Sequence, residues 1–180
     1  MADTKPLSSP SLATLHIIAL MRWDREWYDT LEVRQARMLD DVSALLGQMG
    51  DPSHDTLRHF LLGGQTVILE DIASIRPDLV SLVVIYNASG RLGLGPWYIQ
   101  VDQNLVSGEA LIRNLLTARI DAAKHGLKLL SIGFLPDQNT FVAQLPQLLR
   151  GFNITTTMLN IGDPYRNRPF YWKSPDGTTL

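Results

Sequence analysis

The sequence predicts an α/β fold in which the strands of a parallel sheet alternate with helices. Apolar runs of strand length alternate along the 180 residues with segments whose apolar residues recur at helical spacing. The first run, Leu12–Met21, is apolar at nearly every position, which is typical of a strand buried on both faces of a parallel sheet. Strands and helices in alternation imply right-handed crossover connections.

Four further strands are predicted from short apolar runs bounded by glycine, proline or polar residues. They are Arg58–Leu62, Leu92–Gln100, Leu127–Leu135 and Ile154–Leu159. The segment Leu79–Tyr86 is open between a strand, which its β-branched residues favour, and a helix. The last part, Gly162–Leu180, is rich in Pro, Gly, Arg and Asn, and its Pro175-Asp176-Gly177 turn predicts a hairpin.

Helices are predicted between the strands from capping residues and apolar spacing. Thr30 and Ser107 are good caps for two long helices, and a shorter helix is expected over Thr66–Ile75. The apolar stripes of the long helices are Met38, Val42, Leu45 and Met49 in the first, and Leu111, Leu115, Ala118 and Ala122 in the second. A fourth helix is expected over Phe141–Leu149, broken or kinked at Pro146.

Composition limits the classes of function. With 45% hydrophobic residues the chain can bury one sizeable core, so we expect one α/β domain over residues 12–180 after an extended or disordered stretch, 1–11. A formal charge of −2 gives no field that attracts nucleic acid or a membrane surface. The absence of cysteine leaves His, Asp and Glu as metal ligands. No secretion signal or membrane span is recognised, so a cytoplasmic location is expected.

Two short blocks each place a carboxylate just after a predicted strand. Arg22-Trp23-Asp24-Arg25-Glu26-Trp27-Tyr28 follows the first strand, and Gly133-Phe134-Leu135-Pro136-Asp137 ends the fourth. Ligands of α/β proteins bind beyond the carboxyl ends of parallel strands, so Asp24 and Asp137 are expected at one site. Acids together with tryptophans at such an edge indicate a site that handles sugars.

Each of these residues also has a structural interpretation. Asp137 could instead cap the following helix, and Asp24 could be a solvated loop acid; position alone leaves both interpretations equally open. Asp102, at the end of the third strand, is either a loop acid or a further acid of the pocket. Trp27 and Trp97 offer flat faces that stack on a pyranose ring, although tryptophans are at least as often core residues, and Trp27 is the stronger candidate.

Several blocks, in their order along the chain, resemble the N-terminal part of the zinc-dependent α-mannosidases of glycoside hydrolase family 38. Besides the two acid blocks, they are Gln65 with Leu69-Glu70-Asp71, Gly95-Pro96-Trp97-Tyr98, Val106–Leu115, Gln144-Leu145-Pro146 and Leu149-Arg150-Gly151-Phe152. Matching blocks run from about His16 to Gly177. The resemblance implies a partial barrel, the first part of the seven-stranded β/α domain of this family, and it favours a helix over Leu79–Tyr86.

The resemblance also implies roles for individual residues. Family members carry a His-x-Asp-x-x-Trp pattern after the first strand, whose His and Asp bind zinc, and Arg22, Asp24 and Trp27 stand at these places. Asp137 stands where the family has its nucleophile, which is also a zinc ligand, for retaining hydrolysis of α-mannosides. Trp27, with Trp97 and Asp102, is then expected to contact the mannoside or a mannose-containing oligosaccharide.

The chain departs from the family pattern at the metal site. Arg22 replaces the zinc-binding histidine, and Asn139, Thr140 and Gly63 replace an aromatic, a glycine and an aspartate. A guanidinium cannot ligate zinc. We hypothesise that Arg22 pairs with Asp24 and Asp137 in place of the metal.

Two classes of function therefore remain open. One is an α-mannosidase section whose remaining zinc ligand and acid/base carboxylate are expected beyond Leu180, supplied in a split enzyme by a complementary C-terminal fragment. The other is a non-catalytic remnant that binds carbohydrate or a partner polypeptide. An open sheet edge is expected in either case, so a homo-oligomer is also expected.

Overall fold

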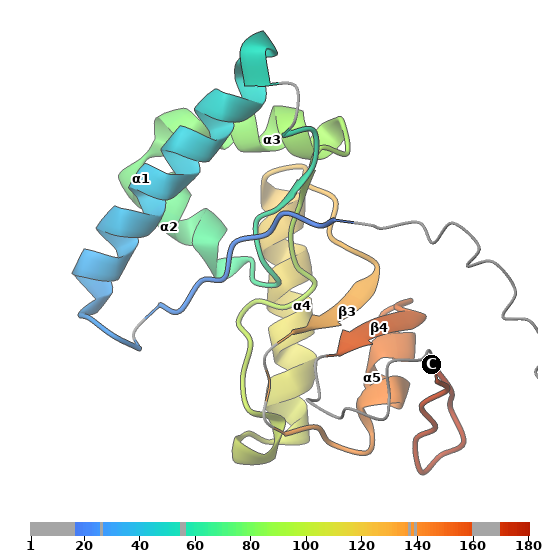
Figure 1. Ribbon diagram of the computed structural model, residues 1–180. Helices are drawn as coiled ribbons and strands as arrows, with labels where there is room; N and C mark the ends of the chain where they lie inside the picture. Colours follow the sequence, from blue (N-terminus) through green and yellow to red (C-terminus); the bar gives the residue numbers. More distant parts are fainter. Residues whose placement is uncertain (1–16, 26, 55–56, 137, 139, 160–169) are drawn as a thin grey trace, which may run out of the picture.

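The computed structural model describes residues 17–25, 27–54, 57–136, 138, 140–159 and 170–180. Its helices are α1 (Leu31–Gly50), α2 (Val67–Ile75), α3 (Val80–Ala88), α4 (Gly108–Lys124) and α5 (Leu145–Gly151). Its strands are β1 (Phe60–Leu61), β2 (Leu92–Gly93), β3 (Ile132–Leu135) and β4 (Thr156–Leu159). Figure 1 shows α1, α2 and α3 grouped together, with α5 beside β3 and β4. The predicted mixture of helices and parallel strands is confirmed.

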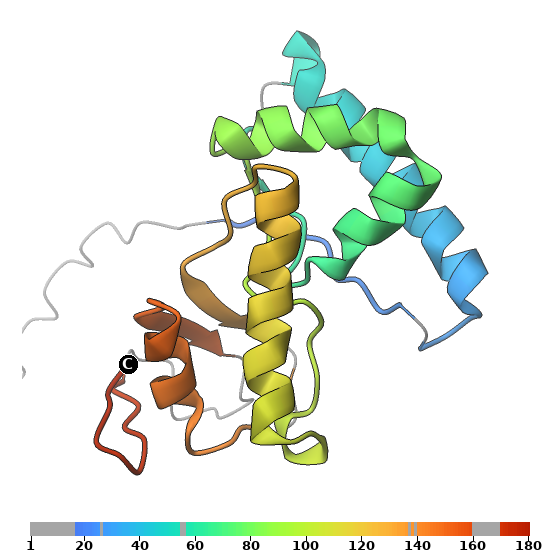
Figure 2. The ribbon, with the colours of Figure 1, turned by 180° about the vertical axis from the view of Figure 1, so that it is seen from behind.

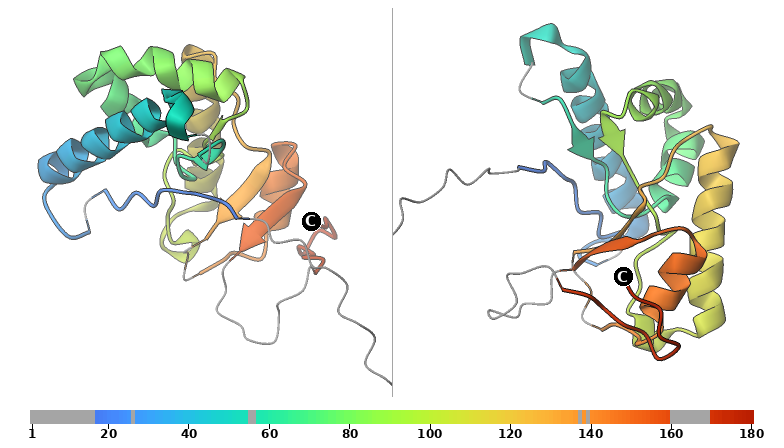
Figure 3. Two further views of the ribbon diagram at one scale, coloured as in Figure 1. Left: turned by 45° about the horizontal axis from the view of Figure 1, so that its top comes forward. Right: turned by 90° about the vertical axis from the view of Figure 1, so that its right-hand side faces the viewer.

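The strands form two small parallel sheets, β1 with β2 and β3 with β4. The members of the second sheet lie side by side in the left view of Figure 3. Further backbone hydrogen bonds join neighbouring segments, from Met21 N to Leu61 O (3.0 Å) and from Leu130 N to Leu94 O (3.0 Å). The predicted strand segments therefore lie beside one another in the order of the chain.

Regular pairing covers less of each segment than the sequence predicts. The first segment pairs through a single bridge, Leu20 with Leu61, and residues 12–16 lie outside the described residues. The predicted strand Leu92–Gln100 is regular only at β2, because Pro96 has no amide hydrogen and Gly95 is left-handed, with φ of 81°. Pairing resumes beyond them at one bridge, between Gln65 and Trp97.

The two long helices form where their caps and apolar stripes predict. Ser107 caps α4, since its Oγ accepts a hydrogen bond from Ala110 N (3.1 Å). Thr30 precedes α1 as predicted, but its side chain makes no capping hydrogen bond. The segment Leu79–Tyr86 lies mainly in helix α3, as the family resemblance favours. Val83, 1% exposed, belongs to the main core, so burial on a helical face outweighs the strand preference of β-branched residues.

The prediction of a helix that begins at Phe141 and kinks at Pro146 is wrong. The helix begins at Leu145, and Pro146 lies in its first turn. Proline suits that position, because the first amides of a helix have no intrahelical acceptor and its fixed φ matches the helix. Val142, before the helix, donates its amide to Gln103 Oε1 (3.0 Å) and packs against the second core cluster described below.

Two groups of buried side chains flank the strand segments. The larger joins α1, α2 and α3 to the first strand segments and includes Val42, Leu62, Ile72 and Leu92. The smaller joins α4 and α5 around Leu135, Leu149 and Trp97. Seen from behind in Figure 2, α4 runs along the strand segments.

The C-terminal residues form the predicted hairpin in a short version. Trp172 and Leu180 exchange backbone hydrogen bonds of 3.0 and 2.9 Å, with an antiparallel bridge between Lys173 and Thr179. In the part of the chain that the structure describes, none of the helices combines the length and the hydropathy that a membrane span requires.

Candidate functional site

An open cleft of about 760 Å³ lies at the carboxyl ends of the parallel segments. Its described lining comes from residues 20–25 and 27, 62–65 and 68, 99–102, and 134, 136 and 138. Each group lies at or just after the carboxyl end of one strand segment, so the cleft has the position that parallel α/β sheets give to ligand sites. Arg22, Asp24, Trp27 and Asp102 all line it.

Arg22 and Asp24 form an ion pair in this cleft. Nε of Arg22 lies 3.2 Å from Oδ1 of Asp24, and the two side chains are 59% and 26% exposed. The residues are two apart in the sequence, and their ion pair brings the two side chains together. The pair places a permanent cation against the carboxylate that the family resemblance assigns to zinc.

The two candidate sugar platforms lie in different surroundings. Trp27 is 79% exposed and lines the cleft. Trp97 is 2% exposed, belongs to the smaller core cluster, and donates from Nε1 to the carbonyl oxygen of Phe134 (3.1 Å). A ring buried in this way presents no face to a sugar, so Trp97 shapes the cleft through Phe134, and only Trp27 is available for stacking.

Asp137 and Asn139 lie outside the described residues. Pro136 and Gln138, which precede and follow Asp137, both line the cleft. Gln138 is held by Gln103, whose Nε2 donates to Gln138 Oε1 at 2.9 Å.

A chain of side-chain amides links the four groups of residues that line the cleft. Gln65 Nε2 donates to the carbonyl oxygen of Trp23 (3.0 Å), while its Oε1 accepts from the backbone amide of Gln100 (3.0 Å). Gln100 Nε2 then donates to the carbonyl oxygen of Phe134 (3.0 Å). The ends of four separate segments are thus fixed relative to one another by neutral hydrogen bonds.

Arg34, on α1, holds the loop that carries Asp24. Its Nε donates to the backbone carbonyl oxygen of Asp24 (3.0 Å), and its guanidinium lies 5.8 Å from the ring centres of both Trp23 and Tyr28. The buried Nε1 of Trp23 has no hydrogen-bond partner among the described residues. Burying an N–H without a hydrogen bond costs free energy and so destabilises this position of the loop. Other contacts must therefore hold the loop in place.

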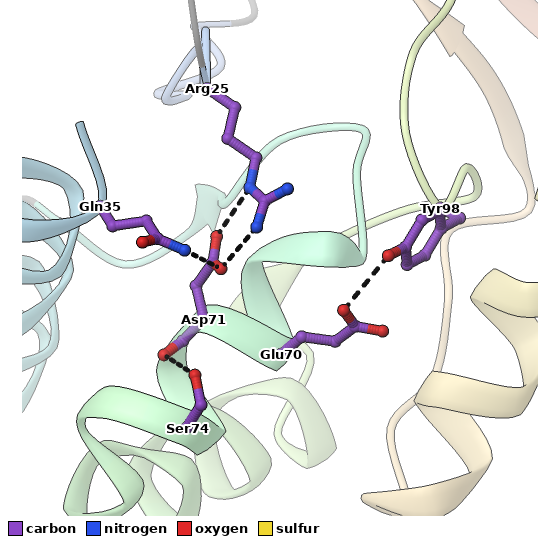
Figure 4. A network of polar contacts seen from close by, with 6 residues as sticks. All are labelled: Arg25, Gln35, Glu70, Asp71, Ser74 and Tyr98. Carbon is purple, nitrogen blue, oxygen red and sulfur yellow. Dashed lines mark hydrogen bonds and ion pairs between the residues drawn. The ribbon is translucent and has the colours of Figure 1, made fainter. Parts of the chain in front are cut away.

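Two neighbouring acids on α2 make the contacts drawn in Figure 4. Asp71 binds Arg25 of the cleft loop, and Glu70 Oε2 accepts a hydrogen bond from the Tyr98 hydroxyl (3.2 Å). Burial and the Glu70 charge raise the pKa of Tyr98, and the same two causes raise the pKa of Asp121 on α4. Glu70, Asp71 and Asp121 are not part of the described cleft lining.

Several of these supporting residues carry no local sequence signal. Gln100 and Arg34 stand in polar or mixed stretches outside the matching blocks, and their partners are 34 and 10 residues away. Arg25 lies in the first acid block, which does not specify its bond to Asp71, 46 residues away. For Gln65 and Asp71, membership in the blocks that match family 38 was a signal, although it specified no contact.

Fold and cleft define an α/β structure with small parallel sheets and an open cleft at the carboxyl ends of their strand segments. The family model described as "Glycosyl hydrolases family 38 N-terminal domain" matches residues 13–180. The chain therefore belongs to glycoside hydrolase family 38, as the sequence blocks indicated.

Similar proteins carry names of mannoside-hydrolysing enzymes. A Halalkalibacterium halodurans protein named "Putative mannosylglycerate hydrolase" is 37% identical over 93% of this chain and 20% of its own length. "Alpha-mannosidase 2C1" of Homo sapiens is 29% identical over 62% of this chain and 11% of its own. The crystal structure of an alpha-mannosidase from Enterococcus faecalis V583 matches with a TM-score of 0.81 and 30% identity, over 91% of this chain and 19% of that chain. This chain thus spans a fifth or less of the length of these relatives.

Proposed function

We propose that this chain forms the first section of a family 38 domain and that its cleft binds the mannose unit of an α-mannoside. The observation that carries the proposal is the cleft itself, whose lining includes exposed Trp27 together with Asp24 and Asp102. An indole face suits the apolar face of a pyranose, and carboxylates accept hydrogen bonds from sugar hydroxyls. The names of the relatives support an α-mannoside as the ligand.

The described residues do not fit the zinc ion of this family. Arg22 stands at the histidine position of the family's His-x-Asp-x-x-Trp pattern. Its guanidinium pairs with Asp24, which stands at the position of the pattern's other zinc ligand. Among the described residues, no three His, Asp or Glu side chains are grouped to hold a metal. We therefore propose that the sugar is bound without zinc and that the Arg22 cation neutralises Asp24 in its place.

A second candidate function is hydrolysis of the α-mannoside. It is supported by the family match and by the place of Asp137 in the sequence, two residues after the end of β3 and between Pro136 and Gln138 of the cleft lining. A retaining glycosidase needs a second carboxyl group about 5 Å from the nucleophile to move the proton. In this candidate the second group comes from a complementary C-terminal fragment or from another copy of the chain.

The open side of β4 supports such a partner. In the described part of the chain, β4 pairs with β3 alone, and Met158 on β4 is 42% exposed. An unpaired strand edge favours addition of another strand. Light scattering of the purified chain tests this point: a monomer at all concentrations contradicts self-association.

The experiment that tests both functions uses the full chain, methyl α-mannoside and an aryl α-mannoside. Calorimetric titration of methyl α-mannoside, with methyl α-galactoside as the control sugar, measures binding in the presence of a chelator. Specific binding that a chelator does not weaken supports the metal-free proposal, and absence of binding contradicts it. Release of the aryl group with added zinc or cobalt, lost in Asp137→Asn, would instead establish hydrolysis.

A further inference from the structure

Asp71 is a buried acid that lies outside the lining of the cleft. It is 2% exposed, on α2, and is the one charged residue among the buried side chains of the described residues. A carboxylate without water is stable in its ionised form only with close charged or hydrogen-bonding partners. Its partners therefore indicate why the position holds an acid.

Both oxygens of Asp71 are bound by Arg25. Arg25 Nη2 donates to Oδ1 at 2.9 Å and Nε donates to Oδ2 at 3.2 Å, which is the two-pronged geometry that a guanidinium offers a carboxylate. Gln35 Nε2, from α1, donates to the same Oδ1 at 2.6 Å. Figure 4 shows these three bonds converging on Asp71 from the cleft loop and from α1.

Arg25 belongs to the loop that presents the site. It directly follows Asp24, lies two residues before Trp27, and is itself part of the cleft lining. The described residues between the Leu20 bridge and α1 form no helix or strand, so side-chain contacts must fix their course. Trp23 and Asp24 are held through their carbonyl oxygens by neutral Gln65 and by Arg34.

We propose that Asp71 is a positioning residue of the sugar site. Through Arg25 it fixes the loop that carries Asp24 and Trp27 against α2, and so sets where the carboxylate and the indole meet the ligand. The effect on ligand binding rests on the proposed function, whereas the effect on loop order does not. The competing explanation is that Asp71 only joins α1 to α2 through Gln35.

The chain offers matched variants that separate these explanations. Asp71→Asn and Arg25→Lys remove the two-pronged ion pair, and Arg25→Lys keeps the charge of the loop. Gln35→Leu removes only the bond to α1. Asp78→Asn is the control, because Asp78 binds Arg76 with the same two-pronged geometry (2.9 and 2.7 Å) at the end of α2, outside the cleft lining.

Amide hydrogen exchange by NMR, with each variant at a temperature where it is fully folded, measures the order of the loop. We expect Asp71→Asn to speed exchange at residues 22–25, 27 and 28 by about tenfold or more, and Arg25→Lys by less, while α1 and α4 stay within about twofold. Gln35→Leu and Asp78→Asn should leave the exchange rates of the loop amides as they are in the unmodified chain. The proposal is overturned if the exchange rates of the loop amides stay unchanged in both Arg25→Lys and Asp71→Asn. It is also overturned if these variants speed exchange equally in the loop, α1 and α2.

A fluorine spectrum and a sugar titration complete the test. In chain labelled with 5-fluorotryptophan, the Trp27 resonance, assigned with Trp27→Phe, should shift or broaden in Asp71→Asn but not in Asp78→Asn. The Kd for methyl α-mannoside should rise about tenfold in Asp71→Asn. If the unmodified chain binds no mannoside, the proposed function fails, whereas loop exchange still decides the role of Asp71.

Discussion

Gly64 passes so close to Gln100 that a Cβ atom on Gly64 would lie 2.5 Å from Nε2 of that glutamine. The same Cβ would lie 2.8 Å from Cδ1 of Phe134. Gln100 donates from this Nε2 to the carbonyl oxygen of Phe134, so a side chain at Gly64 must displace one of the links across the cleft. The close approach explains why glycine stands at this point of the cleft floor.

We therefore expect Gly64→Ala to destabilise the fold by about 1–3 kcal/mol, because the neighbours must shift to admit a methyl group. Gly47→Ala is the control, since Gly47 is exposed on α1 and its added Cβ would meet no atom within 4 Å. It should stabilise the fold by about 0.5–1 kcal/mol, the preference of a helix interior for alanine. Urea denaturation measures both changes, and equal effects would contradict the close approach at Gly64.

Trp27 and Trp97 are expected to respond in opposite ways to substitution. Trp27→Ala should change the free energy of unfolding by less than about 0.5 kcal/mol, because the ring is exposed, while weakening methyl α-mannoside binding about tenfold. Trp97→Phe should destabilise the fold by about 1–3 kcal/mol, because it removes the Nε1 bond to Phe134 and part of a buried ring. Thermal denaturation measures the stability of both variants, and calorimetry measures their affinity for methyl α-mannoside. Unchanged affinity in Trp27→Ala would show that Trp27 does not contact the sugar.

The local features of the fold could be predicted from the sequence. α1 and α4 begin after Thr30 and Ser107, and each has its predicted apolar stripe, because such a stripe is a property of neighbouring residues. Only Ser107 also makes the expected capping hydrogen bond. The start of α5 was missed because Phe141 and Val142 continue its apolar pattern, although they pack against the smaller core cluster without being helical.

The candidate site was predictable in position more than in detail. Asp24, Trp27 and Asp102 follow strand segments, and the rule for parallel sheets places them at one edge, where the cleft lies. The two-pronged bond from Arg25 to Asp71 joins residues 46 apart, so it depends on how α2 packs, which local spacing does not specify. Tryptophan suits both cores and sugar sites, so the sequence alone could not separate buried Trp97 from exposed Trp27.

The Arg22–Asp24 pair gives a prediction about metal binding. In Arg22→His the guanidinium is removed and an imidazole nitrogen becomes available beside Asp24, so we expect this variant to bind zinc at least about tenfold more tightly than the unmodified chain. Arg37→His is the control, because Arg37 pairs with Asp29 (2.7 Å) outside the cleft lining and should give no gain. Zinc retained after gel filtration measures the outcome. Equally tight zinc binding by the unmodified chain would contradict the exchange of arginine for metal.

Asp121 and Asp78 should give opposite pH dependences of stability. Burial first, and then the charge of Glu70, raise the pKa of Asp121, so its ionised form is less favourable in the folded chain than in the unfolded chain. As the pH rises through its ordinary value of 3.8 and then its folded value, this residue lowers the free energy of unfolding. Asp121→Asn should therefore be more stable than the unmodified chain at about pH 7, and its advantage should disappear at about pH 3.

For Asp78 the sign is reversed. The hydrogen bond from Arg76 is the main cause that lowers the pKa of Asp78, so its stabilising contribution is present above its ordinary value of 3.8 and is lost as the pH falls through its folded value. Asp78→Asn should thus be less stable than the unmodified chain at about pH 7, with the difference shrinking in acid as Asp78 itself becomes protonated. Urea denaturation of the three proteins across this range measures both effects. If the two variants shift stability in the same direction at neutral pH, the pKa values of Asp121 and Asp78 are not set by their different surroundings, half-buried beside Glu70 for Asp121 and exposed beside Arg76 for Asp78.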